Sequence, residues 1–345
     1  MKAIAEKAAG VVPGLVAAVI VAAAAKLVEK VLPVHIIGAS VIALFFGMII
    51  NAVRKPSAVF LPGLKFTSKK VLKLAIILLG AGLNVGIVIN VGKMSLCVMF
   101  FTLLMCFGGG YFVGRALGIN WKLSNLISAG TGICGGSAIA AVAPVIDADD
   151  SDVAYALSAT FLFDMAMIVL FPIMGHALGL SDEAYGLWAG TAVNDTSSVV
   201  AAGYAFSEAA GDFATMVKLT RTLSIIPTVV VFALVSARIN RRNGNEEKSA
   251  DGVKSIRFSK VIPWFILGFL ALTVINSFGL IPSGVSSALK SVSKFLMISA
   301  LAAIGLNTSF KDMKKSGIAP MLHGFIISAL VVVVAITVEY FMGLV

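Results

Sequence analysis

Five successive polar residues interrupt an apolar stretch of the sequence: Asn194, Asp195, Thr196, Ser197 and Ser198. The Asn and Asp oxygens can accept hydrogen bonds or coordinate a cation, and the three hydroxyls can also cap a helix. Polar side chains at membrane depth are costly unless they face a cavity or one another. This cluster is therefore either a functional site or a polar contact that joins helices, and the ionisable Asp195 favours a functional site.

A second apolar stretch contains adjacent glycines with small polar neighbours. The residues that could form a site there are Thr131, Gly132, Cys134, Gly135, Gly136 and Ser137. Glycines in a membrane helix either allow close helix packing or mark a break in the helix. Close packing alone does not need Gly135 and Gly136 side by side, so we favour a break, with a new half-helix that starts at about Ser137. The free N–H groups and positive dipole end of such a half-helix favour an anion.

The two stretches resemble each other. The segment AGTGICGGSAIAAVAP (129–144) aligns without gaps, at a constant offset, with AGTAVNDTSSVVAAGY (189–204). A shorter pair, GAGLNVG (80–86) and AIGLNTS (303–309), contains Asn84 and Asn307. Internal repeats of inverted topology are a common basis of alternating access in transporters. We expect the two asparagines either to line the cavity or to cap helix ends.

Two more charges lie inside apolar stretches: Asp164 and Arg221. Pairing them with each other would lower the cost of burying both. The alternative is a functional one, in which Arg221 binds an anionic substrate and Asp164 relays a proton. The sequence leaves both open, and Asp195, Asp164 and Arg221 are together the candidates for ion coupling.

The composition indicates that lipid surrounds most of the chain. Of the 345 residues, 59% are hydrophobic and 13% are charged, against about 25% charged in a typical soluble domain. Spanning helices need about 20 mostly apolar residues. The predicted fold class is therefore an all-α polytopic membrane protein with eleven spans and two broken helices that cross near the bilayer midplane. The predicted spans are 10–30, 35–53, 71–92, 95–117, 123–147, 153–178, 185–206, 213–237, 259–279, 292–309 and 317–343.

The chain reads as one membrane domain over 1–345, with repeat-related halves at roughly 71–178 and 185–343 and a cytoplasmic linker at 240–257. Basic residues crowd the loops on one side, and the other side carries a smaller set. That smaller set is Lys26, Lys30, Lys93, Lys218, Lys290 and Lys294. The asymmetry predicts a multi-pass membrane protein with a cytoplasmic N-terminus and its C-terminus on the opposite side. It also accounts for the net charge of +10 without nucleic-acid binding.

The segments TGICGGSAIAAVAPVI, GTAVNDTSSVVAAG and GAGLN give the chain a resemblance to a known family over nearly its whole length. It resembles the YeiH-type family of bacterial membrane proteins, which are proposed to be sulfate exporters, and this resemblance implies a location in the bacterial inner membrane. More distantly, it is similar to the superfamily of bile-acid and arsenite transporters. That resemblance implies a core and a panel domain, with two broken helices crossing at mid-membrane. Here a single predicted helix separates the two breaks, whereas in the superfamily they lie far apart in the sequence.

The sequence therefore predicts a secondary active transporter that moves a small anion, with sulfate and sulfite as candidates, coupled to H⁺ or Na⁺. The alternative is a cation/proton antiporter with Asp195 as the carrier carboxylate. An intramembrane enzyme or sensor is disfavoured, because no protease, esterase or nucleotide-loop motif appears. We expect no enzymatic activity and no cofactor. The expected partners are the anion, the coupling ion and the bilayer, and the sequence leaves room for a homodimer.

Overall fold

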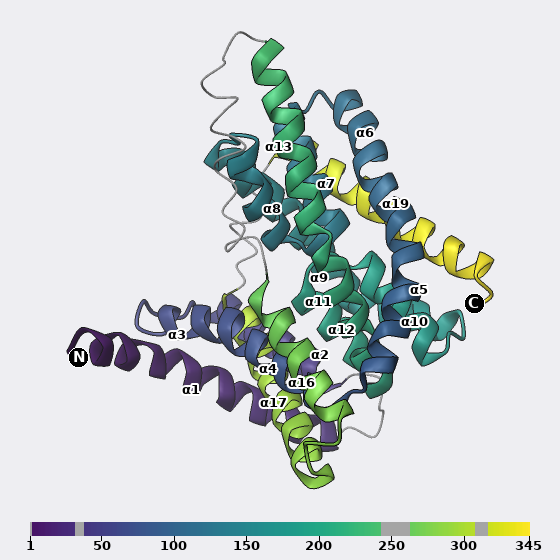
Figure 1. Cartoon of the computed structure of the whole chain (residues 1–345). Helices are drawn as coiled ribbons and strands as arrows, with labels where there is room; N and C mark the ends of the chain where they lie inside the picture. The colour runs from purple at the N-terminus through teal and green to yellow at the C-terminus, as the bar shows by residue number, and fades with distance from the viewer. Residues whose placement is uncertain (1, 32–37, 243–262, 308–316) are drawn as a thin grey trace. The chain divides into compact units, whose positions relative to one another are not determined.

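A computed structural model describes residues 2–31, 38–242, 263–307 and 317–345 (Figure 1). The described residues form helices and connecting turns, without a strand. Most of the predicted linker at 240–257, from residue 243 onwards, lies outside the described residues. The chain separates into two compact units. The first comprises the described residues within 1–90, 200–212 and 264–313, and the second comprises those within 91–199, 213–263 and 314–345.

The first unit is built around one long helix, α17 (Ser283–Asn307), which packs against α1 (Lys2–Val31), α2 (Ala39–Val53) and α4 (Leu72–Leu79) (Figure 1). The helix α16 (Trp264–Ser277) packs against α4. Small residues allow these helices to approach closely, as is typical in membranes. A Cβ on Gly305 would lie 2.1 Å from the Leu44 carbonyl oxygen of α2.

The helix of α4 is one part of a longer helical run. It starts with α3 (Leu61–Phe66), passes through a π-helical turn (Thr67–Val71) into α4, and finishes with a 3-10 turn (Gly80–Gly82). The next helix, α5 (Val85–Leu104), continues through a π-helical turn (Met105–Gly109) into α6 (Gly110–Ala116).

The predicted boundary between the spans 71–92 and 95–117 is therefore wrong, because the chain is helical through Lys93. The helices meet instead at Leu83, whose backbone is extended (φ −117°, ψ 158°). Asn84 caps the new helix, since its Oδ1 accepts a hydrogen bond from the Gly86 N–H at 2.7 Å. Ser277 supports the same turn by accepting from the Val85 N–H at 2.8 Å.

The second unit contains the two stretches singled out from the sequence. Its further helices are α7 (Trp121–Ala129), α8 (Gly136–Val142), α9 (Asp150–Ala177), α10 (Asp182–Ala192), α11 (Thr196–Phe206), α12 (Glu208–Leu223), α13 (Ile225–Arg242) and α19 (Ile318–Phe341). The last part of α11 and the first turn of α12 belong to the first unit. The helix α9 packs against α7 and α19, and α19 also packs against α10. Trp188 of α10 fixes the last contact by donating from Nε1 to the Val332 carbonyl at 2.9 Å.

Six helical stretches of the described residues are long and apolar enough to cross a membrane. They are Gly10–Val31, Val85–Ala116, Asp150–Ala177, Glu208–Ile239, Ser283–Asn307 and Ile318–Phe341. Shorter apolar helices cover Ala39–Val53, Gly136–Val145 and Trp264–Ser277. The structure thus bears out an all-helical protein with several membrane-spanning helices. The number eleven stays a prediction.

Candidate substrate and ion site

The first interruption lies between α7 and α8. A π-helical turn (Gly130–Cys134) extends α7, and the Gly135 N–H closes it on the Gly130 carbonyl at 2.9 Å. The backbone of Gly135 then takes φ 64° and ψ −131°, a conformation that residues with a Cβ rarely adopt. The new helix α8 begins at Gly136, one residue before the predicted start at Ser137. The glycines therefore mark a break.

The second interruption lies between α10 and α11. Here α10 ends at Ala192, and Val193 is extended (φ −75°, ψ 137°). Asp195 caps α11, since its Oδ2 accepts from the Ser197 N–H at 2.9 Å and also from the Ser197 hydroxyl. The polar run thus replaces the flexible glycines of the first interruption with a side-chain cap.

The two interruptions touch each other within the second unit. A Cβ built on Gly135 would lie 3.1 Å from both the Cβ and the Oδ1 of Asp195. These two residues occupy paired positions in the alignment of 129–144 with 189–204. Residues far apart in the sequence are therefore brought together at the two points where the helices break.

Asp164 of α9 holds the second interruption in place. Its side chain is 1% exposed, and its two oxygens accept from the N–H groups of Asn194 and Asp195, each at 2.9 Å. These N–H groups precede α11 and have no helical partner of their own. A buried carboxylate with two N–H donors satisfies both the backbone and its own charge.

Two basic residues of α12 hold the ends of the preceding half-helices. Arg221 donates from Nε to the Gly132 carbonyl at 2.7 Å and from an Nη to the Thr131 carbonyl at 2.8 Å. Lys218 donates from Nζ to the Val193 carbonyl at 2.8 Å. Both side chains are fully buried. Cations at the C-terminal end of a helix are favourable because the dipole is negative there.

An ion pair between Asp164 and Arg221, one of the two alternatives that the sequence left open, is not what the structure shows. Among the described residues the two side chains form no ion pair, because the carboxylate contacts backbone N–H groups and the guanidinium contacts backbone carbonyls. Interrupted helices expose both kinds of backbone group. Each charge is therefore stabilised by the end of a helix.

Sequence reasoning missed Lys218, which it assigned to a membrane surface. The structure buries Lys218 completely beside the second interruption. Its spacing of three residues from Arg221 places both on one face of α12, and this spacing was the available signal.

Two buried polar atoms next to the interruptions have no hydrogen-bond partner among the described residues. They are the Thr131 Oγ1 and the Asn194 Oδ1, on side chains that are fully buried. The Nδ2 of the same asparagine donates to Ser328 Oγ at 3.3 Å. Buried polar groups are normally satisfied, so these two atoms are available to a ligand.

The other predicted site residues fall into three groups. Cys134, Ser197 and Ser198 are buried, and Thr196 is half-buried at the start of α11. Ser137 is exposed on α8, and no side chain caps that helix. Asn84 and Asn307 belong to the first unit, where Asn84 is a helix cap and Asn307 is the last residue of α17.

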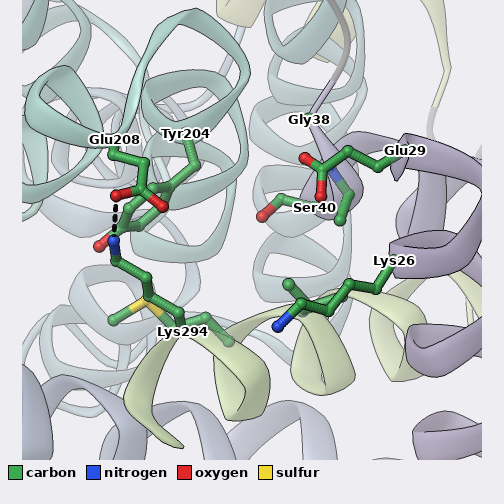
Figure 2. A pocket seen from close by; sticks show the side chains of 10 residues that line it. Lys26, Glu29, Gly38, Ser40, Tyr204, Glu208 and Lys294 are labelled. Atoms are coloured by element: carbon green, nitrogen blue, oxygen red, sulfur yellow. Dashed lines mark hydrogen bonds and ion pairs between the residues drawn. The ribbon is translucent and has the colours of Figure 1, made fainter. Parts of the chain in front are cut away.

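The first unit has a polar pocket of its own, with a volume of about 110 Å³ (Figure 2). Lys294 pairs with Glu208 at 2.5 Å (Nζ to Oε2), and Glu29 accepts from the Ala39 N–H at 2.7 Å. Lys26 also lines the pocket. Both acids thus already have partners within the protein, and the residues that line this pocket include none from the two interruptions. The interruptions in the second unit remain the better candidate site.

The fold and the site define a class: a helical membrane protein in which two interrupted helices meet over buried charges. The model of the family described as "Conserved hypothetical protein 698" matches residues 13–324, so the chain belongs to this family. A "UPF0324 membrane protein" of Clostridium tetani is 54% identical over 334 residues, which cover 96% of this chain and 97% of the relative. UPF0324 membrane proteins of Streptococcus agalactiae (96% of this chain and 98% of the relative covered) and Fusobacterium nucleatum (90% and 92%) are each 38% identical. The resemblance to the YeiH-type family is thereby confirmed.

Proposed function

We propose that this protein is a secondary active transporter that moves a small anion across the membrane by alternating access. The observation that supports this most strongly is the meeting of two helix interruptions at Gly135 and Asp195 over the buried charges of Asp164, Lys218 and Arg221. Interrupted helices whose ends face a shared site are typical of secondary transporters. Irregular backbone at membrane depth is tolerated where protein or a water-filled cavity surrounds it.

The balance of charge favours an anion as the substrate. Lys218 and Arg221 offset Asp164 and Asp195 when all four are ionised. Asp195 is only half-buried, so a proton can reach it from water more readily than it can reach Asp164. Protonation of Asp195 leaves one uncompensated positive charge, which attracts an anion. In this scheme one H⁺ accompanies the anion, so a monovalent anion such as hydrogen sulfite moves without net charge and the divalent sulfate moves with one net negative charge.

The unpartnered atoms of Thr131 and Asn194 are the proposed contacts for the anion. The threonine hydroxyl can donate a hydrogen bond, and the asparagine amide can donate after a half-turn that exchanges its oxygen and nitrogen. Ser137 and Thr196 lie near the starts of α8 and α11, where free N–H groups favour negative charge. Sulfate and sulfite are the first substrates to test.

The wider architecture remains part of the proposal. We infer eleven spans, repeat-related halves, crossing of the interruptions near the bilayer midplane, and an inner-membrane location with a cytoplasmic N-terminus. The paired positions of Gly135 and Asp195 support a repeat, because the same structural event occurs at aligned places.

A cation/proton antiporter is the second candidate. It is favoured by the unpartnered Asn194 Oδ1 beside the half-buried carboxylate of Asp195, since oxygens are the usual ligands of hard cations. The buried side chains of Lys218 and Arg221 count against the antiporter, because their positive charges repel a bound cation.

Flux measurements on the purified protein in proteoliposomes separate the two functions. An inward H⁺ gradient should drive accumulation of radioactive sulfate or sulfite in the anion transporter, and Asp195→Asn should abolish the H⁺ dependence. Cation efflux driven by the same gradient, with no effect of either anion, would establish the antiporter instead.

A further inference from the structure

We propose that the ammonium group of Lys218 occupies the place of a coupling cation, so that this protein binds no Na⁺ at its second interruption. The proposal rests on the proposed function only in calling the displaced ion a coupling ion. It concerns cation binding, which can be measured without transport.

The proposal starts from the Val193 carbonyl, which accepts a hydrogen bond from Lys218. This carbonyl lies beyond the end of α10, where the helix is unwound, and the next helix begins at Thr196. Unwound carbonyls and the C-terminal ends of half-helices are the groups that coordinate Na⁺ in transporters with broken helices. Here the Val193 carbonyl accepts from Lys218 Nζ at 2.8 Å and from an Arg221 Nη at 3.4 Å.

The surroundings of Lys218 are those of a bound cation rather than of a surface lysine. Its side chain is fully buried, although lysine is almost never fully buried unless it is paired. The carboxylates of Asp164 and Asp195 belong to the same junction, and their negative charges attract the ammonium group. A tethered ammonium can therefore satisfy the same oxygen and the same field that a monovalent cation would.

The arrangement has a consequence for ion coupling. A Na⁺ ion at this carbonyl would lie against two buried positive charges at low dielectric, where like charges repel strongly. Sodium is therefore excluded as long as Lys218 is present, and H⁺ remains as the coupling ion. Removing the ammonium group without filling its space should convert the position into a Na⁺ site.

The test compares Na⁺ with K⁺ as stabilisers of the full-length protein in detergent. The native protein should melt at the same temperature in either salt. Lys218→Ala should melt at a higher temperature in Na⁺ than in K⁺, with a difference that rises with the logarithm of the Na⁺ concentration and reaches about 2–4 °C at ten times the dissociation constant. Lys218→Met is the matched control, because its side chain removes the charge but fills the space. It should show no difference between the salts.

A Na⁺-specific shift in the native protein would overturn the proposal, and so would a folded Lys218→Ala protein without such a shift. If Lys218→Ala does not fold in ordinary buffer, expression and extraction in Na⁺ rather than K⁺ decides the question. Recovery of folded protein in Na⁺ alone supports the proposal, and equal failure in both salts overturns it. None of these readouts depends on flux, so failure of the transport assay is a separate result.

Discussion

The two interruptions of the second unit solve one structural problem by different chemistry. The first breaks its helix with Gly135 at φ 64°, and no side chain caps the helix that follows. The second breaks with extended Val193 and caps α11 with Asp195. The first therefore supplies backbone groups and the unpartnered Thr131 hydroxyl, whereas the second also supplies the carboxylate of Asp195.

The two helices that support the interruptions, α9 and α12, also differ in the backbone groups that their side chains contact. Asp164 of α9 contacts the N–H groups of the second interruption alone. Lys218 and Arg221 of α12 contact carbonyls of both interruptions. The two aligned segments thus share a helix break, while the charged side chains that contact them differ.

The largest expected effect comes from the residue that joins the two interruptions. Arg221→Met removes two charge-assisted hydrogen bonds, to the Thr131 and Gly132 carbonyls, and should lower the free energy of unfolding by about 3–5 kcal/mol. Arg115→Met is the control, since Arg115 is exposed on α6 and should change stability by less than about 0.5 kcal/mol. Denaturant unfolding in detergent measures both. Equal losses would show that Arg221 does not hold the interruptions.

The backbone of the first interruption is the next point to break. Gly135→Ala places a Cβ at a positive φ and 3.1 Å from Asp195, so we expect a loss of about 1–3 kcal/mol from strain, increased by this contact. Gly136→Ala meets only the flexible end of Leu157, at 3.0 Å, and begins a helix. It should change stability little, because the gain of about 0.5–1 kcal/mol from replacing glycine by alanine in a helix offsets the cost of the contact with Leu157. Thermal unfolding that ranks the two variants equally would contradict this account of the break.

The second interruption should respond to the loss of its acceptor. Asp164→Asn keeps one acceptor oxygen for two N–H groups, so one of the N–H groups of Asn194 and Asp195 is left unpaired. We expect a cost at the lower end of about 1–3 kcal/mol. Ser158→Ala on the same helix removes only a bond to the Ala154 carbonyl and serves as the control. Amide exchange at residues 194 and 195 should quicken in the first variant alone.

The smallest effect compares two serines at paired positions of the alignment. Ser197→Ala removes a hydroxyl that donates to Asp195 and should cost about 0.5–1.5 kcal/mol. Ser137→Ala should change stability by less than about 0.5 kcal/mol, because Ser137 is exposed and caps nothing. Matched thermal melts measure the difference, and its reversal would mean that the first interruption carries the polar cap.

The positions of the interruptions could be predicted from the sequence, because glycines and polar residues stand out in an apolar stretch. The partners of Asp164 and Arg221 could not, since charge complementarity alone suggested a pair, and the free backbone groups appear only once the helices have broken. Lys218 was assigned to the surface because lysines near span ends usually reach the interface. The boundary near Lys93 was misplaced for a similar reason, since a lysine in an apolar run resembles a turn.

Water access to the junction tests the central claim most directly. In a Cys97→Ala background, where Cys106 and Cys134 are buried, we would place a cysteine at Thr196 and, as a lipid-facing control, at Leu162 of α9, which is 40% exposed. The account predicts that a charged, membrane-impermeant thiosulfonate labels Thr196→Cys in membrane vesicles but not Leu162→Cys. Labelling of Thr196→Cys by an apolar maleimide alone would contradict it, because the interruptions would then meet in a dry interior.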